Sequence, residues 1–120
     1  MDSIFNELPF MAITVSDKNG KITDMNNRSA QTFNNSGGRS LIGKDLTDCH
    51  SQRSQQIIKA MQTDPQTNVY TIEKGGVRKL IYQTPYYKDG VFDGLIEFSM
   101  VIPETMPHYV RDAGQNEGKK

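Results

Sequence analysis

The sequence predicts an α+β fold, a five-stranded antiparallel sheet with short helices on one face. One observation is the order of patterns along the chain: a short hairpin, several short helical segments, and then three longer stretches that alternate with period two. The other is size, because 120 residues with 35% apolar side chains supply one small core. We expect a single domain over residues 1–102, with 1–10 as an N-terminal helical cap, and a polar tail over 103–120.

The first third of the chain predicts a short helix followed by a hairpin. Acidic and hydroxyl side chains at the start can cap a helix that carries Ile4, Phe5 and Leu8. We expect its apolar side to dock on the domain. Residues 11–15 and 21–25 are rich in strand-forming residues and flank the turn sequence DKNG, which is typical of a β-hairpin.

The middle of the chain predicts short helices separated by a loop. Residues 27–33 have apolar side chains three residues apart, and the sequence NNSGG at 34–38 predicts a flexible loop. Residues 51–62 have the period of a helix with one apolar face, formed by Ile57, Ile58 and Met61.

The last third predicts three strands, over residues 69–74, 77–85 and 92–102, joined by glycine-containing turns. In the third of these strands, alternate residues form an unbroken apolar face: Ile96, Phe98, Met100 and Ile102. The intervening residues form a mixed face: Leu95, Glu97, Ser99 and Val101. We expect the apolar face to be the core side and the mixed face to be half exposed.

The charge and hydropathy patterns exclude several classes of function. The 14 basic and 14 acidic side chains balance, which argues against the broad basic surface that nucleic-acid binding needs. No apolar run approaches the roughly 20 residues that span a bilayer, and the chain start lacks the basic residues of a secretory signal. With one cysteine, no internal disulfide can form. We therefore expect a cytoplasmic protein.

Three motifs resemble those of PAS domains. Residues 12–27, AITVSDKNGKITDMNN, are similar to the opening of that family, where a D-x-x-G-x-I turn precedes an asparagine at the first helix, matched here by Asn26. Residues 41–50, LIGKDLTDCH, resemble its "IG+…H" segment. Residues 89–97, DGVFDGLIE, resemble its closing D-G-x-x-x-G hairpin. Together the motifs cover residues 8–102.

Within the PAS family, the stretch at 42–54 is most similar to the PAS-like region that accompanies hemerythrin-like iron domains in some bacterial proteins. The two histidines of this chain cannot furnish a di-iron site. The resemblance implies a cavity between sheet and helices, which family members use for haem, flavin, small acids or nothing. It also implies that the outer sheet face and the flanking helices serve dimerisation and signal transfer.

The predicted function is therefore a stand-alone PAS-type sensory module that binds a small ligand or cofactor and signals through a homodimer or a partner protein. The alternative is a ligand-free dimerisation module that uses the sheet face bearing Leu95 and Val101 together with the N-terminal helix. A haem-binding redox or gas sensor is less favoured. No paired carboxylates, catalytic triad or phosphate-binding loop appear in the sequence, so we predict no enzyme activity.

The predicted ligand site combines apolar walls with a few polar side chains. Its candidate residues are His50, Arg53, Ile57, Ile58, Met61, Tyr70, Tyr82, Phe98 and Met100. The hydroxyl of Tyr70 or Tyr82 would point into the cavity. Arg53 would pair with an anionic ligand, although a solvent-facing position is the commoner arrangement for arginine.

The dipeptide Cys49-His50 leaves the cofactor open. It could act as a nucleophile, a haem ligand or part of a metal site, but a buried structural role is favoured for Cys49 and a hydrogen-bonding role for His50. Flavin is disfavoured, because Gly43 is not followed by the asparagine-cysteine pair of flavin photosensors in the family. Haem is open, with these two residues as the nearest ligands. Zinc is disfavoured, and His108 is expected in the tail.

Overall fold

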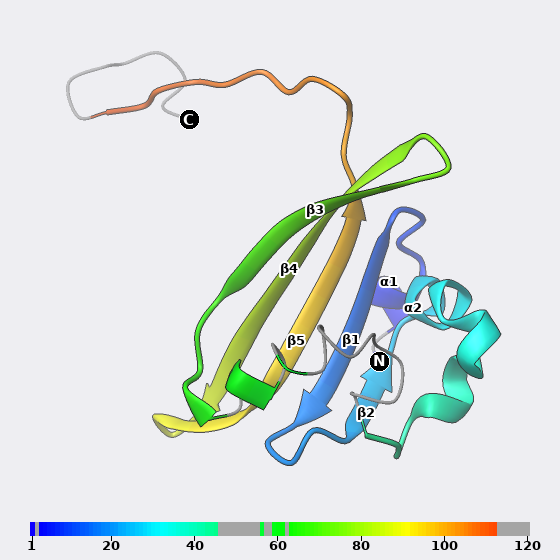
Figure 1. Ribbon diagram of the computed structural model, residues 1–120, viewed down its shortest axis with the longest axis vertical. Helices are drawn as coiled ribbons and strands as arrows, with labels where there is room; N and C mark the ends of the chain where they lie inside the picture. Colours follow the sequence, from blue (N-terminus) through cyan, green and yellow to red (C-terminus); the bar gives the residue numbers. More distant parts are fainter. Residues whose placement is uncertain (2, 46–55, 57–58, 62, 113–120) are drawn as a thin grey trace.

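The computed structural model describes residues 1, 3–45, 56, 59–61 and 63–112 (Figure 1). Within these ranges the chain forms five strands and four short helical segments with described bounds, and residues 56, 59–61 and 63 are helical as well. In chain order the elements with described bounds are α1 (Ser3–Asn6), β1 (Met11–Asp17), β2 (Ile22–Met25), α2 (Asn27–Thr32), the 3₁₀ helices η1 (Asn34–Ser36) and η2 (Gly38–Leu41), β3 (Asn68–Lys74), β4 (Val77–Lys88) and β5 (Val91–Val101).

The five strands form one open sheet in the order β2-β1-β5-β4-β3, and every neighbouring pair is antiparallel. Strand β5, the last in the chain, therefore occupies the centre of the sheet, between the β1-β2 hairpin and the β3-β4 hairpin. Helix α2 and the 3₁₀ helices lie beside the sheet at its β1-β2 end in Figure 1. The predicted five-stranded antiparallel sheet with short helices is confirmed.

The turn between β1 and β2 depends on one aspartate. The Asp17 carboxylate accepts hydrogen bonds from the backbone amides of Asn19, at 2.9 Å, and Lys21, at 3.0 Å. Gly20 takes the left-handed conformation, with φ of 87°, which a residue without Cβ adopts at no steric cost. The sequence DKNG thus closes the predicted hairpin by local chemistry alone.

The two faces of the sheet differ in what covers them. We call the side on which α2 lies the helix face; it carries Thr14, Glu97 and Gln83, which are neighbours in the strand register. The core cluster lies on this side and consists of Ile22, Met25, Leu41, Met61 and Leu95. The opposite side, the outer face, carries Ile13, Ile96, Phe98, Met100, Leu80 and Tyr82.

The sequence-based assignment of the β5 faces was therefore wrong. The mixed face, with Leu95 only 4% exposed, packs toward the helices, whereas the apolar face with Phe98 and Met100 points outward. Burying the mixed face is feasible because its polar side chains find partners: no buried side-chain nitrogen or oxygen atom of the described residues lacks a hydrogen bond. Apolarity alone did not reveal which side the helices take.

Three smaller expectations also need correction or fall outside the description. Helix α1 ends earlier than expected and does not dock its apolar side, since Ile4 is 72% and Phe5 46% exposed. Residues 34–38 contribute to two 3₁₀ helices instead of a loop. Of the helix predicted over 51–62, only residues 56 and 59–61 are described, and they are helical. The described residues contain no helix that is both long and apolar enough to cross a bilayer.

Candidate functional site

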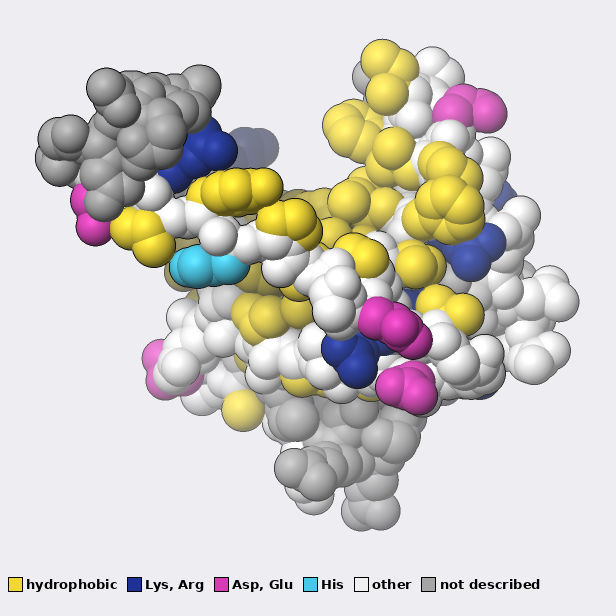
Figure 2. All heavy atoms as spheres, turned by 90° about the horizontal axis from the view of Figure 1, so that it is seen from above, with side chains coloured by type: hydrophobic (Ala, Val, Ile, Leu, Met, Phe, Trp, Pro, Cys, Tyr) yellow, Lys and Arg dark blue, Asp and Glu magenta, His cyan; other side chains and the backbone are white. Residues whose placement is uncertain are grey.

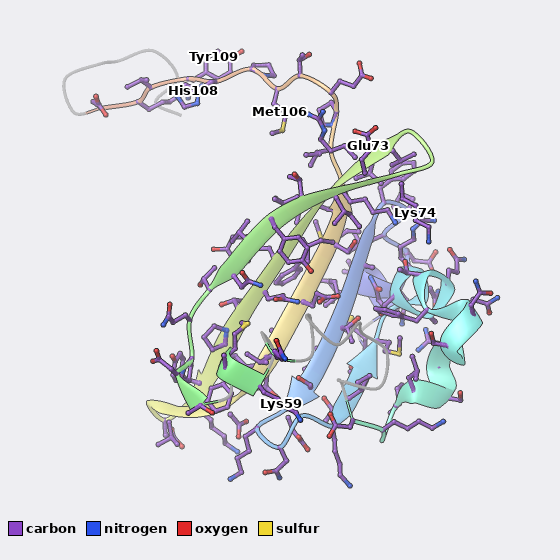
Figure 3. All side chains as sticks on the ribbon, in the orientation of Figure 1. Lys59, Glu73, Lys74, Met106, His108 and Tyr109 are labelled. Carbon is purple, nitrogen blue, oxygen red and sulfur yellow. The ribbon has the colours of Figure 1, made fainter. Side chains whose placement is uncertain are left out.

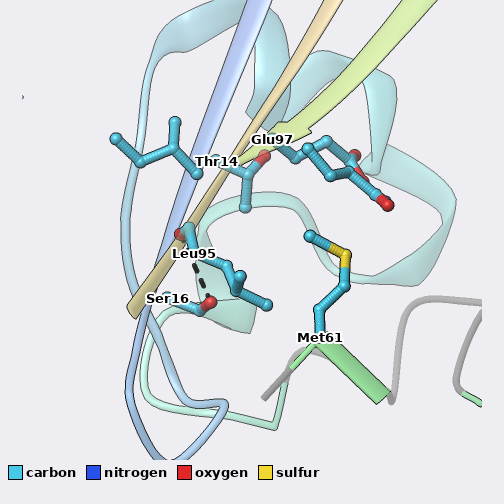
Figure 4. Close-up of a pocket in the computed structure, with 7 residues that line it drawn as sticks. Thr14, Ser16, Met61, Leu95 and Glu97 are labelled. Carbon is cyan, nitrogen blue, oxygen red and sulfur yellow. Dashed lines mark hydrogen bonds between the residues drawn. The ribbon is translucent and has the colours of Figure 1, made fainter. Parts of the chain in front are cut away.

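A cavity of about 190 Å³ opens on the helix face, between the end of α2 and strands β1, β3, β4 and β5. Its apolar walls include Ala12, Phe33, Ile72 and Ile81, and its polar groups include Thr14, Tyr70, Lys74, Lys79, Glu97 and Ser99. A smaller space of about 10 Å³, large enough for about one water molecule, shares Thr14 and Glu97 and reaches Met61 and Leu95 (Figure 4). Both spaces therefore meet at Glu97.

A row of hydrogen-bonded side chains fixes the Glu97 carboxylate. The Asn68 side-chain amide donates to Gln83 Oε1 at 2.8 Å, and Gln83 Nε2 donates to Glu97 Oε1 at 2.7 Å. These residues come from β3, β4 and β5 and lie side by side because the register pairs Asn68 with Gln83 and Gln83 with Glu97. Gln83 is only 5% exposed, so both ends of its amide are oriented by these bonds.

Tyr70 places a phenol beside this carboxylate. Burial raises the pKa of Tyr70 above its ordinary value, and the negative charge of Glu97 raises that pKa further. The phenol is therefore neutral at physiological pH and is able to donate a hydrogen bond into the cavity. The cavity thus combines an acceptor, Glu97, with a donor, Tyr70.

Two lysines line the same cavity at its other end. Lys79 lies opposite Val101 in the register. Val101 is four residues from Glu97 along β5, so the backbones of Val101 and Glu97 lie about 13 Å apart. Lys74 lies at the end of β3 (Figure 3) and is exposed. The cavity therefore carries negative charge at one end and positive charge at the other.

A buried asparagine connects the cavity wall to the N-terminal segment. Asn26 is fully buried, and its side-chain oxygen accepts from the amides of Ile13 and Ser29, each at 2.9 Å. Its nitrogen donates to the carbonyls of Phe5 and Met11, each at 2.9 Å. Asn26 thus caps α2 and fixes both β1 and α1 to it.

The structure separates the residues that the sequence grouped into one site. Met61 and Tyr70 do line the two spaces. Tyr82, Phe98 and Met100 lie on the outer face, so the expectation that they share the cavity is corrected; the reason is the inverted assignment of the β5 faces. Outside the described residues lie Cys49, His50, Arg53, Ile57 and Ile58.

The sequence analysis did not predict the polar side chains that line the cavity. Thr14, Gln83, Glu97 and Lys79 were not among the predicted ligand-site residues, because polar residues in strands are ordinarily solvent-exposed. The available signal was the alternation of β5, in which Glu97 and Ser99 share a face with Leu95. Among the described residues, no group of three or more histidine, cysteine or acidic side chains could hold a metal ion, and His108 lies beyond β5, away from the cavity (Figure 3).

Solved structures resemble this architecture over most of its length. The PAS domain of the histidine kinase ThkA matches with a TM-score of 0.63 and 18% identity, covering 76% of this chain and 98% of that one. The PAS domain of Bordetella pertussis BvgS matches with a TM-score of 0.60 and 18% identity, covering 84% of this chain and 82% of that one. The chain has a PAS fold.

Two further structures bear on this PAS fold. A C-terminal domain from Streptococcus mutans matches with a TM-score of 0.64 and 17% identity, over 82% of this chain and 79% of that one. The Aer2 receptor from Vibrio cholerae, described as a dual PAS-heme oxygen sensor, matches with a TM-score of 0.53 and 20% identity, over 78% of this chain and 95% of that one. No protein-family model matches the sequence, and no curated protein does either. At these identities the likeness concerns the PAS fold alone.

Proposed function

We propose that this PAS-fold chain is a sensory module that binds a small polar organic molecule in the helix-face cavity. The observation that carries the proposal is the row from Asn68 through Gln83 to Glu97, which presents an oriented carboxylate to a cavity of about 190 Å³. Ligand sites combine apolar walls with a few well-placed polar groups. Here Ile72 and Ile81 supply the walls.

The size of the cavity favours a small ligand over haem or flavin. A cavity of about 150 Å³ accommodates benzene, and drug-sized ligands take about 300–1,000 Å³, so about 190 Å³ suits a molecule slightly larger than benzene. Because the cavity has opposite charges at its two ends, a molecule with a hydrogen-bond donor at one end and an acceptor at the other fits best. A haem sensor stays the less favoured hypothesis.

Occupancy would reach the surface through α2 and the N-terminal segment. Thr14 lines the cavity and bonds to Ser29 in α2, while Asn26 links α2 to the carbonyl of Phe5. A ligand that binds one arrangement of these groups better than another would shift the equilibrium between them. The N-terminal segment would then present the signal to a partner protein or a second copy.

Titration of the purified protein with a panel of small amines, carboxylic acids and amino acids tests the proposal by calorimetry. We expect a saturable ligand whose affinity falls by about tenfold or more in Glu97→Gln, as for loss of a charge-assisted hydrogen bond. The matched control is Glu73→Gln, which neutralises an exposed carboxylate at the far end of β3. Absence of binding across the panel, or a haem absorption band in the protein as purified, would overturn the proposal.

The second candidate is ligand-free dimerisation through the sheet, favoured by the apolar outer face. The predicted surface needs correction, since Leu95 belongs to the core cluster and cannot lie at an interface. Tyr82, which is 38% exposed on the outer face, is the informative position. Tyr82→Glu should lower a sedimentation-derived mass if this face dimerises, whereas Gln31→Glu, exposed on α2, should not.

A further inference from the structure

The chain leaves the domain as an extended arm after β5. We call residues 103–112 the C-terminal arm; all of them are exposed, and they run away from the sheet (Figure 1). Met106 is 60% and Tyr109 67% exposed, and both project from the arm in Figure 3. Large apolar side chains presented together on an extended segment are typical of a surface that becomes covered in an assembly.

The root of the arm is held by strand β4. The amide of Ile102 donates to the carbonyl of Arg78 at 3.0 Å, and Arg78 Nη1 donates to the carbonyl of Glu104 at 3.5 Å. Pro103 and Pro107 restrict the backbone further, because proline fixes φ and cannot donate a hydrogen bond. These contacts set the direction in which the arm departs.

The outer face carries a groove that is entirely apolar. It has a volume of about 230 Å³ and is lined by Met1, Phe5, Ile13, Ile96 and Phe98. Figure 2 shows a hollow between the arm, marked by the cyan His108, and a second group of hydrophobic side chains on the opposite side. The same chain therefore exposes large apolar side chains on the arm, Met106 and Tyr109, and an apolar groove on the sheet.

We propose that the C-terminal arm of one copy packs into the outer-face groove of a second copy, and that the exchange is reciprocal. Ten residues in an extended conformation span about 30 Å, which exceeds the width of about 24 Å across five strands. A reciprocal exchange about a two-fold axis buries both arms and closes the assembly at a dimer.

The geometry favours the groove of a second copy over the chain's own. Ile96 and Phe98 precede the arm by only a few residues in β5, so the arm would have to reverse at its root to reach them. That reversal would break the contact between Arg78 and Glu104. A second copy accepts the arm in the direction it already takes.

Within the exchanged arm, Met106 is the side chain that enters the groove. The groove has no polar side chain to satisfy a hydroxyl, and the flexible thioether of methionine fills irregular apolar spaces. Tyr109 lies at the rim, where the guanidinium of Arg111 stands 5.4 Å from the centre of its ring. The proposal is independent of ligand binding, because the cavity opens on the opposite face.

Sedimentation of the full chain over a range of concentrations tests the exchange. We expect a dimer, and a dissociation constant raised by about tenfold or more when Met106→Asp, which removes the central anchor, is combined with Tyr109→Asp at the rim. Thr105→Asp adds one negative charge, against two in the double variant, at a polar, exposed position of the arm and should leave the dimer unchanged. A wild-type monomer, or a double variant as dimeric as the control, would overturn the proposal.

Crosslinking distinguishes exchange from folding back. In a Cys49→Ser background, chains with Met106→Cys are mixed with chains carrying Phe5→Cys and oxidised. A disulfide between the two chains is expected, and Gln31→Cys on the opposite side of the sheet should give none. A disulfide that forms only when both cysteines are on one chain would show that the arm covers its own sheet. Calorimetric titration of the same variants reports separately on the cavity.

Discussion

The hydroxyl groups of Thr14 and Ser29 lie 2.5 Å apart, both buried, and share a hydrogen bond in which either can donate. Thr14 belongs to β1 and lines the cavity, whereas Ser29 belongs to α2 and bonds to the cap residue Asn26. This single bond is therefore where the cavity meets the network that holds the N-terminal segment.

Breaking this bond on one side should cost stability. Ser29→Ala leaves the Thr14 hydroxyl buried without its partner, and we expect the free energy of unfolding to fall by about 1–3 kcal/mol. Combining it with Thr14→Val removes both polar groups and should cost less than the sum of the two single changes. Urea denaturation of the wild type, the two single variants and the double variant measures the coupling energy between Thr14 and Ser29. If the losses of unfolding free energy in the single variants add up to the loss in the double variant, the bond is contradicted.

Asn26 should be among the most sensitive positions in the chain. Asn26→Ala removes four hydrogen bonds to buried or partly buried backbone groups, and we expect a loss of about 3 kcal/mol or more. Asn35→Ala, at an exposed position, should change stability by less than about 0.5 kcal/mol. Equal melting temperatures for these two variants would refute the role assigned to Asn26.

Gly94 is required by a close approach and not by its backbone conformation. A Cβ at this position would lie well inside contact distance of the Ser16 carbonyl oxygen and of the Tyr86 ring. The Tyr86 side chain lies against Gly94, and its hydroxyl donates a hydrogen bond to the Ser16 carbonyl at 3.2 Å. Gly94→Ala should therefore destabilise the protein by about 1–3 kcal/mol or more.

A second substitution distinguishes the two clashes at Gly94. Adding Tyr86→Phe removes the hydroxyl but leaves the backbone oxygen of Ser16 in place, so we expect it not to restore the stability of Gly94→Ala. Thermal unfolding followed by circular dichroism compares the three proteins. Recovery of the wild-type midpoint in the double variant would show that the hydroxyl, and not the backbone, excludes a side chain.

The protein should lose stability at alkaline pH through two tyrosines. Burial raises the pKa of Tyr70 and of Tyr86, and nearby carboxylates raise both further: Glu97 for Tyr70, and Asp93 and Asp17 for Tyr86. Above about pH 10, the unfolded phenols release protons that the folded state retains. The unfolded state then binds fewer protons, so the unfolding free energy falls as pH rises through the folded pKa values.

Urea unfolding at several pH values above neutrality checks this dependence. Tyr70→Phe should reduce the alkaline slope, because one of the two groups no longer titrates. Tyr87→Phe, at a side chain that is 55% exposed, should leave the slope as in the wild type. A slope that is the same in all three proteins would rule out Tyr70 as a source.

Local patterns in the sequence determined much of this fold. The turn at Asp17 and Gly20, the helix cap at Asn26 and the period of two in the last three strands each depend on residues close together in the chain. Local chemistry could therefore predict the strands and an antiparallel sheet, whereas the order β2-β1-β5-β4-β3 came from the structure. The motifs led to the PAS fold, and the association with hemerythrin-like domains stays a prediction.

Only the tertiary structure decided which face of β5 is covered. Alternation shows that Phe98 and Glu97 point to opposite sides, but it does not say on which side α2 packs. That choice depends on partners distant in sequence, Gln83 for Glu97 and Ser29 for Thr14, which satisfy the polar groups and so allow them to be buried. The cavity, its charged ends and the exposed apolar outer face all follow from those contacts between distant residues.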